Sequence, residues 1–285
     1  MNNNHDFTEG EILRPMLTFR GPVLLAMFLQ SLYGAVDLMV VGKFAEAADA
    51  SGVNTGSQVM MMLTFVVTSF SMAVTILMGQ HIGEKSPEKA GDVIGTGIIM
   101  FAIMAIAMTF AGVIFAPEIA AGLKAPRDAF NQTVSYIRVC SSGFVFIIAY
   151  NVMSGVFRGV GDSVMPLISV TIASVFNIIG DLFFVKGMGM GAKGAAIATV
   201  MAQVISVILS MFIISKRKMP FILTKDKLRI DKSIAKRIFS LGTPLLLQDI
   251  LVSVSFLFLL AITNSRGVIV SAGVGIAEKL CGFIM

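Results

Sequence analysis

Long apolar runs are the feature that most limits what this chain can fold into. Of its 285 residues, 56% are hydrophobic and 14% are charged, whereas a soluble domain has about 25% charged residues. Several runs are long enough to cross about 30 Å of hydrocarbon as helices. They lack the regular alternation of polar and apolar residues that a membrane β-barrel requires. We therefore predict an all-α membrane protein.

The runs predict seven membrane helices and the start of an eighth. They cover about 16–42, 55–80, 92–116, 132–157, 164–186, 194–215 and 238–263, with the eighth beginning near 271. The stretch 117–131 is expected to hold a short surface helix. Acidic residues precede the first run, which is too long for a signal peptide, so we expect it to stay as a membrane anchor.

Basic residues predict the orientation. Nine of the 22 Lys and Arg residues lie in the linker 216–237, and loops rich in Lys and Arg stay on the cytoplasmic side. We expect this side and the N-terminus to be cytoplasmic, in a multi-pass protein of the inner (plasma) membrane. The net charge of +5 is explained by such loops, so no nucleic-acid partner is expected.

Two similar units flank the linker. The segment 21–25 (GPVLL) resembles 243–247 (TPLLL), and 51–53 (SGV) resembles 272–274 (AGV). Six helices separate the copies, so both should insert the same way up, as parallel repeats of transporters do. We predict a six-helix lobe over 1–215, a basic cytoplasmic linker over 216–237, and the incomplete start of a second lobe over 238–285.

Polar side chains gather at one depth inside the apolar runs. Asp37, Asp181, Thr199 and Tyr136 each lie about five residues from the outer end of their predicted helix, or roughly 6–8 Å below the boundary. Asn177 precedes Asp181 by four residues and so shares its helix face. A carboxylate at the centre of a membrane helix costs roughly 2.5–3.5 kcal/mol and marks a functional site.

Oxygen-bearing side chains at one level suit a hard cation or a shared proton. Two nearby carboxylates repel each other unless a proton or cation lies between them. We predict that Asp37, Asp181, Asn177, Thr199 and Tyr136 couple transport to H⁺ or Na⁺, with the first four as candidate Na⁺ ligands. The alternative is that the hydroxyls and amides only join membrane helices. Gln30, Gln203 and Asp249 are further candidates for lining the cavity.

Pro22 is a candidate hinge in the first predicted helix. Proline removes a backbone hydrogen bond and kinks a helix, so Pro22 is a candidate hinge, with a static kink as the alternative. The sequence contains no HExxH, GxSxG or P-loop motif, which argues against an enzyme and against a cofactor. Soft Met and Phe walls suit apolar organic cations.

Five motifs resemble the multidrug and toxic compound extrusion (MATE) family. They are Leu32-Tyr-Gly-Ala-Val-Asp-Leu-Met-Val-Val-Gly42, Gly79-Gln-His-Ile-Gly83 with Pro87-Glu-Lys-Ala90, Phe157-Arg-Gly-Val-Gly-Asp-Ser163, Asn177-Ile-Ile-Gly-Asp181, and Gly191-Ala-Lys-Gly-Ala-Ala196. The resemblance implies twelve helices in two lobes and export of organic cations in exchange for H⁺ or Na⁺. It implies a first-lobe ion site at the five residues predicted above, and bending of the first helix at Pro22.

Two departures from the family pattern stand out. The chain ends where the eighth helix should continue, so we expect transport to require the remainder of a second lobe. Some family members carry a glutamate in the seventh helix, where this chain reads Gln248-Asp249-Ile-Leu-Val-Ser253. Coupling is therefore expected to rest on the first lobe.

Two other functions remain open at this point. A lipid-linked sugar flippase of the same superfold would have a cavity lined by several Arg or Lys residues, and Arg138 is the one candidate for such a residue. A non-transporting membrane scaffold is the other alternative. Efflux that depends on an ion gradient would separate the transporter from the scaffold.

Overall fold

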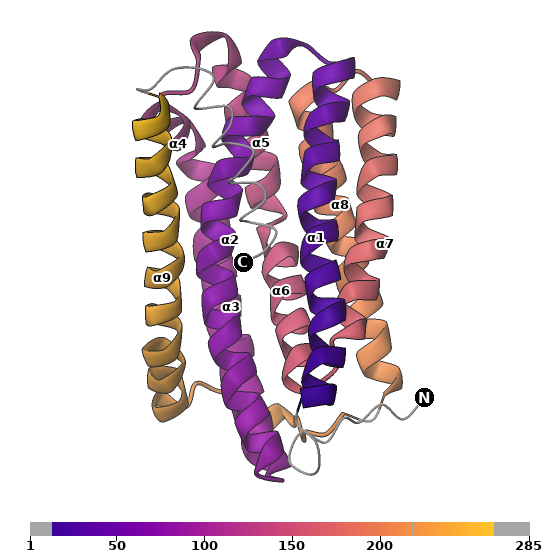
Figure 1. The fold of residues 1–285 in the computed structure, drawn as a ribbon, viewed down its shortest axis with the longest axis vertical. Helices are drawn as coiled ribbons and strands as arrows, with labels where there is room; N and C mark the ends of the chain where they lie inside the picture. The colour runs from indigo at the N-terminus through magenta and orange to yellow at the C-terminus, as the bar shows by residue number, and fades with distance from the viewer. Residues whose placement is uncertain (1–12, 218, 265–285) are drawn as a thin grey trace.

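The structure is a bundle of long helices that run roughly side by side (Figure 1). The computed structural model describes residues 13–217 and 219–264, and these residues contain no strand. The helices are α1 (Leu13–Phe44), α2 (Ala47–Gly83), α3 (Pro87–Ile114), α4 (Ala116–Gly122), η1 (Arg127–Ala129), α5 (Phe130–Ser142), α6 (Phe144–Gly159), α7 (Val164–Asp181), η2 (Leu182–Gly187), α8 (Gly191–Lys216), η3 (Lys225–Lys227) and α9 (Lys232–Asn264).

The membrane-spanning character of the bundle is confirmed. Among the described residues, five helices are long and apolar enough to cross a bilayer, and a bent pair, α5 with α6, would make a sixth. Large apolar side chains such as Phe110, Ile208 and Phe212 are exposed on the outside of the bundle. Such exposure is unfavourable in water but suits lipid, because hydrocarbon solvates these side chains.

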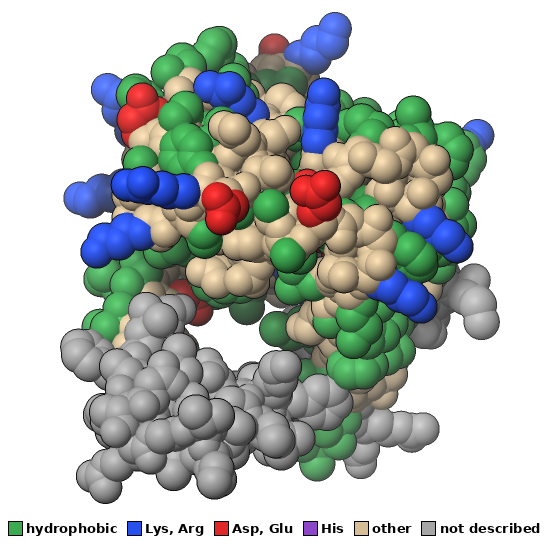
Figure 2. Space-filling view, turned by 90° about the horizontal axis from the view of Figure 1, so that it is seen from above, with side chains coloured by type: hydrophobic (Ala, Val, Ile, Leu, Met, Phe, Trp, Pro, Cys, Tyr) green, Lys and Arg blue, Asp and Glu red, His purple; other side chains and the backbone are tan. Residues whose placement is uncertain are grey.

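The helices run between two ends of the bundle. We call the end where α2 stops at Gly83 and α3 starts at Pro87 the linker end, and the end where α1 stops at Phe44 the far end. Figure 2 looks onto the far end, where Lys and Arg side chains surround a few acidic ones. The predicted surface helix in 117–131 is present at the far end as α4, which has seven residues.

Small residues set how the helices pack. α7 lies between α1 and α8, while α2 contacts α3, α5, α6 and α9. A Cβ on Gly180 would lie 2.9 Å from the Cβ of Ala198, so α7 and α8 approach closely because one of the two residues lacks a side chain. Small residues commonly allow such contacts between membrane helices.

The fourth membrane helix differs from the prediction. We predicted one helix over 132–157, and the structure has α5 and α6 meeting at Gly143 with a bend of 53°. A Cβ on Gly143 would overlap the Val200 side chain of α8. The bend thus lies where α8 comes closest to the backbone at Gly143, a contact that a hydropathy pattern does not reveal.

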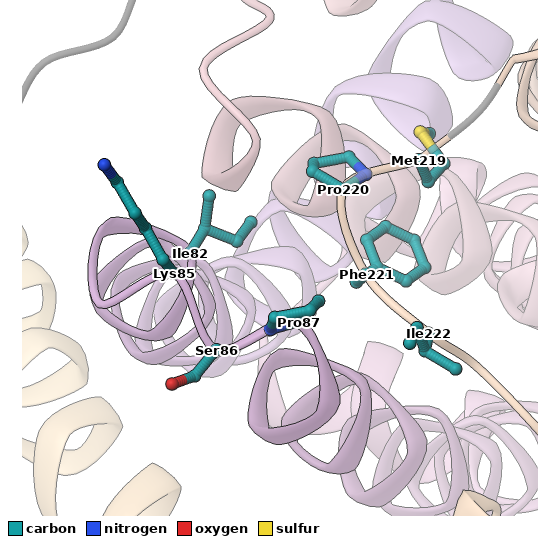
Figure 3. Close-up of a pocket in the computed structure, with 8 residues that line it drawn as sticks. All are labelled: Ile82, Lys85, Ser86, Pro87, Met219, Pro220, Phe221 and Ile222. Carbon is teal, nitrogen blue, oxygen red and sulfur yellow. The ribbon is translucent and has the colours of Figure 1, made fainter.

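The basic linker lies along the first turns of α3. Ile222 donates a backbone hydrogen bond to the Pro87 carbonyl (3.2 Å), and the Thr96 hydroxyl donates to the Arg229 carbonyl (3.2 Å). A pocket of about 380 Å³ lies between the linker and the α2–α3 turn (Figure 3). Its lining is Ile82, Lys85, Ser86, Pro87, Met219, Pro220, Phe221 and Ile222.

The predicted second lobe is described only as far as α9. This helix packs against α2 and α3, and the predicted helix over 238–263 is confirmed within it. The predicted helix beginning near 271, and the second copy of the repeat at 272–274, lie outside the described residues. The division into lobes at 215 and 238 stays a prediction.

Candidate functional site

Asp37 and Asp181 meet inside the bundle. Asp37 lies on α1 and is 6% exposed, and Asp181 ends α7 and is 0% exposed. Their carboxyl groups contact each other. Asp37 shares the buried face of α1 with Val40 and Val41, because residues three and four apart lie on one helix face. The predicted acidic pair therefore exists and faces inward.

Several buried oxygen atoms on α1, α7 and α8 lack donors. The Asn177 amide nitrogen donates to the Thr199 hydroxyl at 3.5 Å, which joins α7 to α8. Apart from the facing carboxyl group, no donor among the described residues reaches Oδ1 of Asp37, either carboxyl oxygen of Asp181, Oδ1 of Asn177, or Oε1 of Gln203. A buried acceptor without a donor costs about 1–3 kcal/mol, so such a cluster favours binding of a cation or proton.

The site lies towards the far end of the bundle, as the sequence predicts, but somewhat deeper. Asp37 lies seven residues before the end of α1, and Thr199 lies eight residues after the start of α8. At 1.5 Å per residue both lie about 11 Å from the far end, slightly deeper than the sequence indicated.

Tyr136 lies on α5, which packs against α2 and α8. Its ring is 3% exposed and packs against α2 at Gly56, where a Cβ would lie 2.5 Å from the Tyr136 Cδ1 atom. Cys140, one turn further along α5, interacts with Tyr136 and lies within electrostatic range of Asp37. Tyr136 and Cys140 are four residues apart and so share one side of α5.

Three predicted residues lie elsewhere. Gln30 is exposed on α1, and Pro22 is half-buried in α1, which continues as helix through it. Asp249 of α9 accepts a hydrogen bond from the Ser69 hydroxyl of α2 (3.0 Å). Ser69 is 13 residues beyond Gly56, or about 20 Å along α2. The structure thus does not bring Asp249 to the acidic pair, and its role in a wider cavity stays a prediction.

A change of helix type follows Asp181. We predicted a plain helix over 164–186, but the α-helix ends at Asp181 and continues as a π-helix, η2. π-Helical turns are rare and occur often at functional sites. Hydropathy could not reveal this turn, because it changes the hydrogen-bond register and leaves the apolar pattern in place.

The family model described as MatE matches residues 22–183, more than half of the chain. The chain belongs to the MatE family. This agrees with the resemblance carried by the five motifs, and the all-helical fold agrees with solved MATE transporter structures.

Named relatives of this MatE chain are multidrug proteins. It is 26% identical to the probable multidrug resistance protein YpnP of Bacillus subtilis, over 98% of this chain and 62% of that protein. It is 23% identical to the multidrug export protein MepA of Staphylococcus saprophyticus, over 97% and 61%. The chain thus spans about three fifths of the length of the curated relatives it matches.

Solved structures show the same fold. A multidrug resistance MATE family transporter in an outward-facing conformation superposes with a TM-score of 0.86 at 22% identity, over 98% of this chain and 62% of that one. A MOP superfamily transporter from Pyrococcus furiosus, whose binding pocket is described as having reversed polarity, gives 0.87 at 21% identity, over 99% and 63%.

Proposed function

We propose that this chain contains the ion-coupling lobe of a multidrug exporter, which exchanges organic cations for H⁺ or Na⁺ by alternating access. The observation that carries the proposal is the buried contact between Asp37 and Asp181 beside oxygens without donors. The names of the relatives support export of small molecules. The protein acts as a transporter, not as an enzyme, and its coupling ion is not a cofactor.

The chemistry of the pair supports ion coupling. Two unit charges 4 Å apart repel by about 4 kcal/mol at an effective dielectric constant of 20. One proton shared by the carboxyl groups, or one cation between them, removes that repulsion. Asp37, Asp181, Asn177 and Thr199 supply only oxygen ligands, which suit Na⁺ better than a soft metal. No cluster of three or more His, Cys, Asp or Glu occurs among the described residues.

Coupling requires that the charge of the pair affect the helices that carry it. Asp37 lies on α1 and Asp181 on α7, so loading or unloading the site changes the attraction between these two helices. Pro22 lies 15 residues before Asp37, or about 22 Å towards the linker end. We propose that α1 bends there as the site changes its charge.

Orientation and partners follow from the same proposal. The linker 216–237 carries nine of the 22 Lys and Arg residues, so we propose that the linker end faces the cytoplasm of an inner-membrane protein. The acidic pair then lies nearer the external side, where the driving ion enters. The substrates are small organic cations, and transport needs the remainder of the second lobe. The flippase alternative would require several basic residues in the cavity, whereas the sequence offers Arg138 as the candidate.

The test is exchange by the full-length protein in proteoliposomes, driven separately by a Na⁺ gradient and by a pH gradient. We expect uptake of a cationic dye against one of these gradients, and its loss in Asp37→Asn. The matched control is Glu118→Gln, an exposed acidic residue at the far end on α4, which should transport normally. Normal exchange by Asp37→Asn would refute the proposal.

A further inference from the structure

The first turns of α2 touch two of the helices that build the proposed ion site. Asp49, Gly52 and Gly56 follow one another at spacings of three and four residues, so they share one face of α2. Asp49 contacts the start of α8, and the two glycines contact α5. This face touches the helices that carry Thr199 and Tyr136.

Asp49 caps α8 from a neighbouring helix. The backbone N–H of Ala192 donates to Oδ1 of Asp49 at 2.9 Å. A carboxylate at the first turn of a helix satisfies an amide that has no partner within the helix, and it is attracted by the helix dipole. The carboxylate lies directly over Gly191, where a Cβ would overlap it, and Gly191 has a φ of +53°. Both facts require glycine at this position.

The capped amide shares a helix face with the site residues of α8. Thr199 and Gln203 follow Ala192 by seven and eleven residues, which at 3.6 residues per turn places all three on one face. The cap therefore fixes the height and rotation of the face that carries Thr199. The Thr199 hydroxyl accepts the hydrogen bond from Asn177, and Asn177 lies one helical turn before Asp181 on α7.

The two glycines fix α5 in the same way. A Cβ on Gly52 would lie 2.7 Å from the Gln132 Cβ, and one on Gly56 would lie 2.5 Å from the Tyr136 ring. Because no side chain separates the helices, the Tyr136 ring rests against the backbone of α2. One face of α2 thus determines the positions of both hydroxyl-bearing residues of the proposed site.

We infer that Asp49 is a positioning residue for ion coupling, acting through α8 on Thr199 and Asn177. This inference rests on the proposed function. Loss of the cap should allow α8 to shift and should weaken ion binding without removing any oxygen from the site. We expect Asp49→Ala to raise the concentration of driving ion at half-maximal exchange by about fivefold to tenfold, which is the stability contribution of a typical helix cap expressed as a fold-change. The maximal rate per folded molecule should stay near the wild-type value.

Two further variants separate positioning from folding. Asp49→Ser keeps a good capping oxygen and should return most of the ion affinity. Glu46→Ala removes an acidic residue three positions earlier, which is exposed and makes no capping hydrogen bond, and should match the wild type. If Asp49→Ala gives no folded protein, Asp49→Asn serves instead. It keeps the acceptor and loses the charge, so a shift of about twofold to fivefold is expected.

The experiment measures ion dependence of exchange in proteoliposomes for these variants and for Asp37→Asn. This inference would be overturned if folded Asp49→Ala needs the same ion concentration for half-maximal exchange as the wild type while Asp37→Asn loses exchange. Asp49→Asn is read in the same way where it serves instead. The proposed function would then still stand. Normal exchange in Asp37→Asn would instead overturn the proposed function. A shift in Asp49→Ala that Asp49→Ser reverses and Glu46→Ala lacks would support positioning.

Discussion

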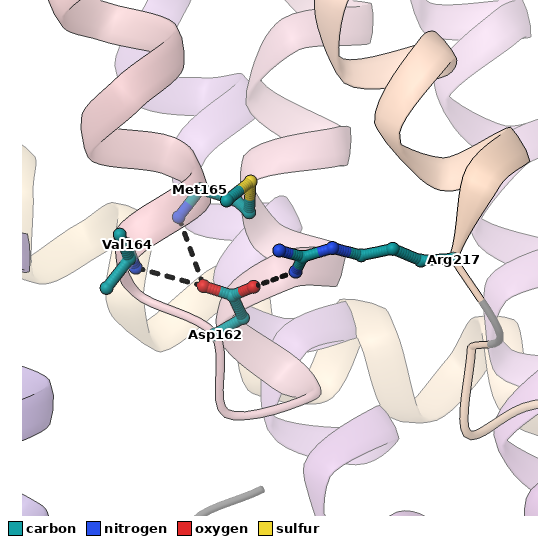
Figure 4. Close-up of polar contacts among 4 residues, drawn as sticks. All are labelled: Asp162, Val164, Met165 and Arg217. Atoms are coloured by element: carbon teal, nitrogen blue, oxygen red, sulfur yellow. Dashed lines mark hydrogen bonds and ion pairs between the residues drawn. The ribbon is translucent and has the colours of Figure 1, made fainter. Parts of the chain in front are cut away.

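Two sets of aspartates in this molecule have opposite surroundings. Asp162, in the turn between α6 and α7 at the linker end, uses both carboxyl oxygens. Its Oδ1 accepts from the backbone amides of Val164 (3.0 Å) and Met165 (3.1 Å), and its Oδ2 accepts from Arg217 at 2.7 Å (Figure 4). Asp37 and Asp181 are more deeply buried, yet their oxygens meet chiefly each other.

The difference separates a structural acid from a candidate functional one. An acid that holds a fold together is more stable the more donors it has. An acid that must load and release an ion cannot have all its oxygens occupied by fixed donors. The linker end shows the first pattern repeatedly, for Lys227 with Asp92 (3.2 Å) and for His81 with Glu84 (2.9 Å).

The largest expected effect tests this contrast at the acidic pair. Asp37→Asn should abolish exchange, as proposed above, while leaving the melting temperature unchanged or higher, because it removes one of two facing carboxylates. Thermal unfolding in detergent, measured beside the exchange rate, checks both parts. A large loss of stability in Asp37→Asn would place this residue with Asp162 as a structural acid.

The next effect concerns the linker on α3. A Cβ on Gly95 would overlap the Lys227 carbonyl, which is backbone and cannot move aside cheaply. Gly95→Ala should therefore displace the linker and destabilise the protein by about 1–3 kcal/mol. The displaced linker should be cleaved faster by a protease that cuts after lysine, and the melting temperature should fall below that of the wild type.

The matched control for the linker is Gly79→Ala on α2. Its added Cβ would lie 3.6 Å from the Gly159 carbonyl, an ordinary contact. It should be neutral or stabilising, because alanine favours helix over glycine by up to about 1 kcal/mol. Equal stability of Gly95→Ala and Gly79→Ala would show that the linker does not hold to α3.

Sequence reasoning found the helices and the acidic pair for physical reasons. Apolar length shows which segments enter the membrane, and an acid such as Asp37 inside such a segment is conspicuous because its insertion is unfavourable. The bend at Gly143 and the cap by Asp49 could not be found in this way. Each depends on a contact with a distant part of the chain, with Val200 and with Gly191. Neither a glycine nor an acid in the first turn of a helix carries any sign of its partner.

A smaller effect is expected at Asp162 itself. Asp162→Ala removes the acceptor for two helix amides and the partner of Arg217. The cap should account for about 1 kcal/mol, and the ion pair for less, because Arg217 is half-exposed. The melting temperature should fall modestly, and the rate of exchange per folded molecule should stay unchanged. This is the reverse of the result expected for Asp37→Asn. Loss of exchange with unchanged melting would contradict the assignment of Asp162 as structural.

The smallest effect is expected at Glu84, the most exposed of the paired acids. The hydrogen bond from His81 is the main cause that lowers the pKa of Glu84 below its ordinary value. A lowered pKa in the folded state means that the contact stabilises the fold above the ordinary carboxyl pKa, about 4.3, and that this contribution is lost as the pH falls further. The wild type should therefore melt slightly above Glu84→Gln at neutral pH, and the two should converge on acidification. A difference that grows as the pH falls would have the wrong sign, and would mean that the protonated carboxyl, not the carboxylate, makes the stabilising contact with His81.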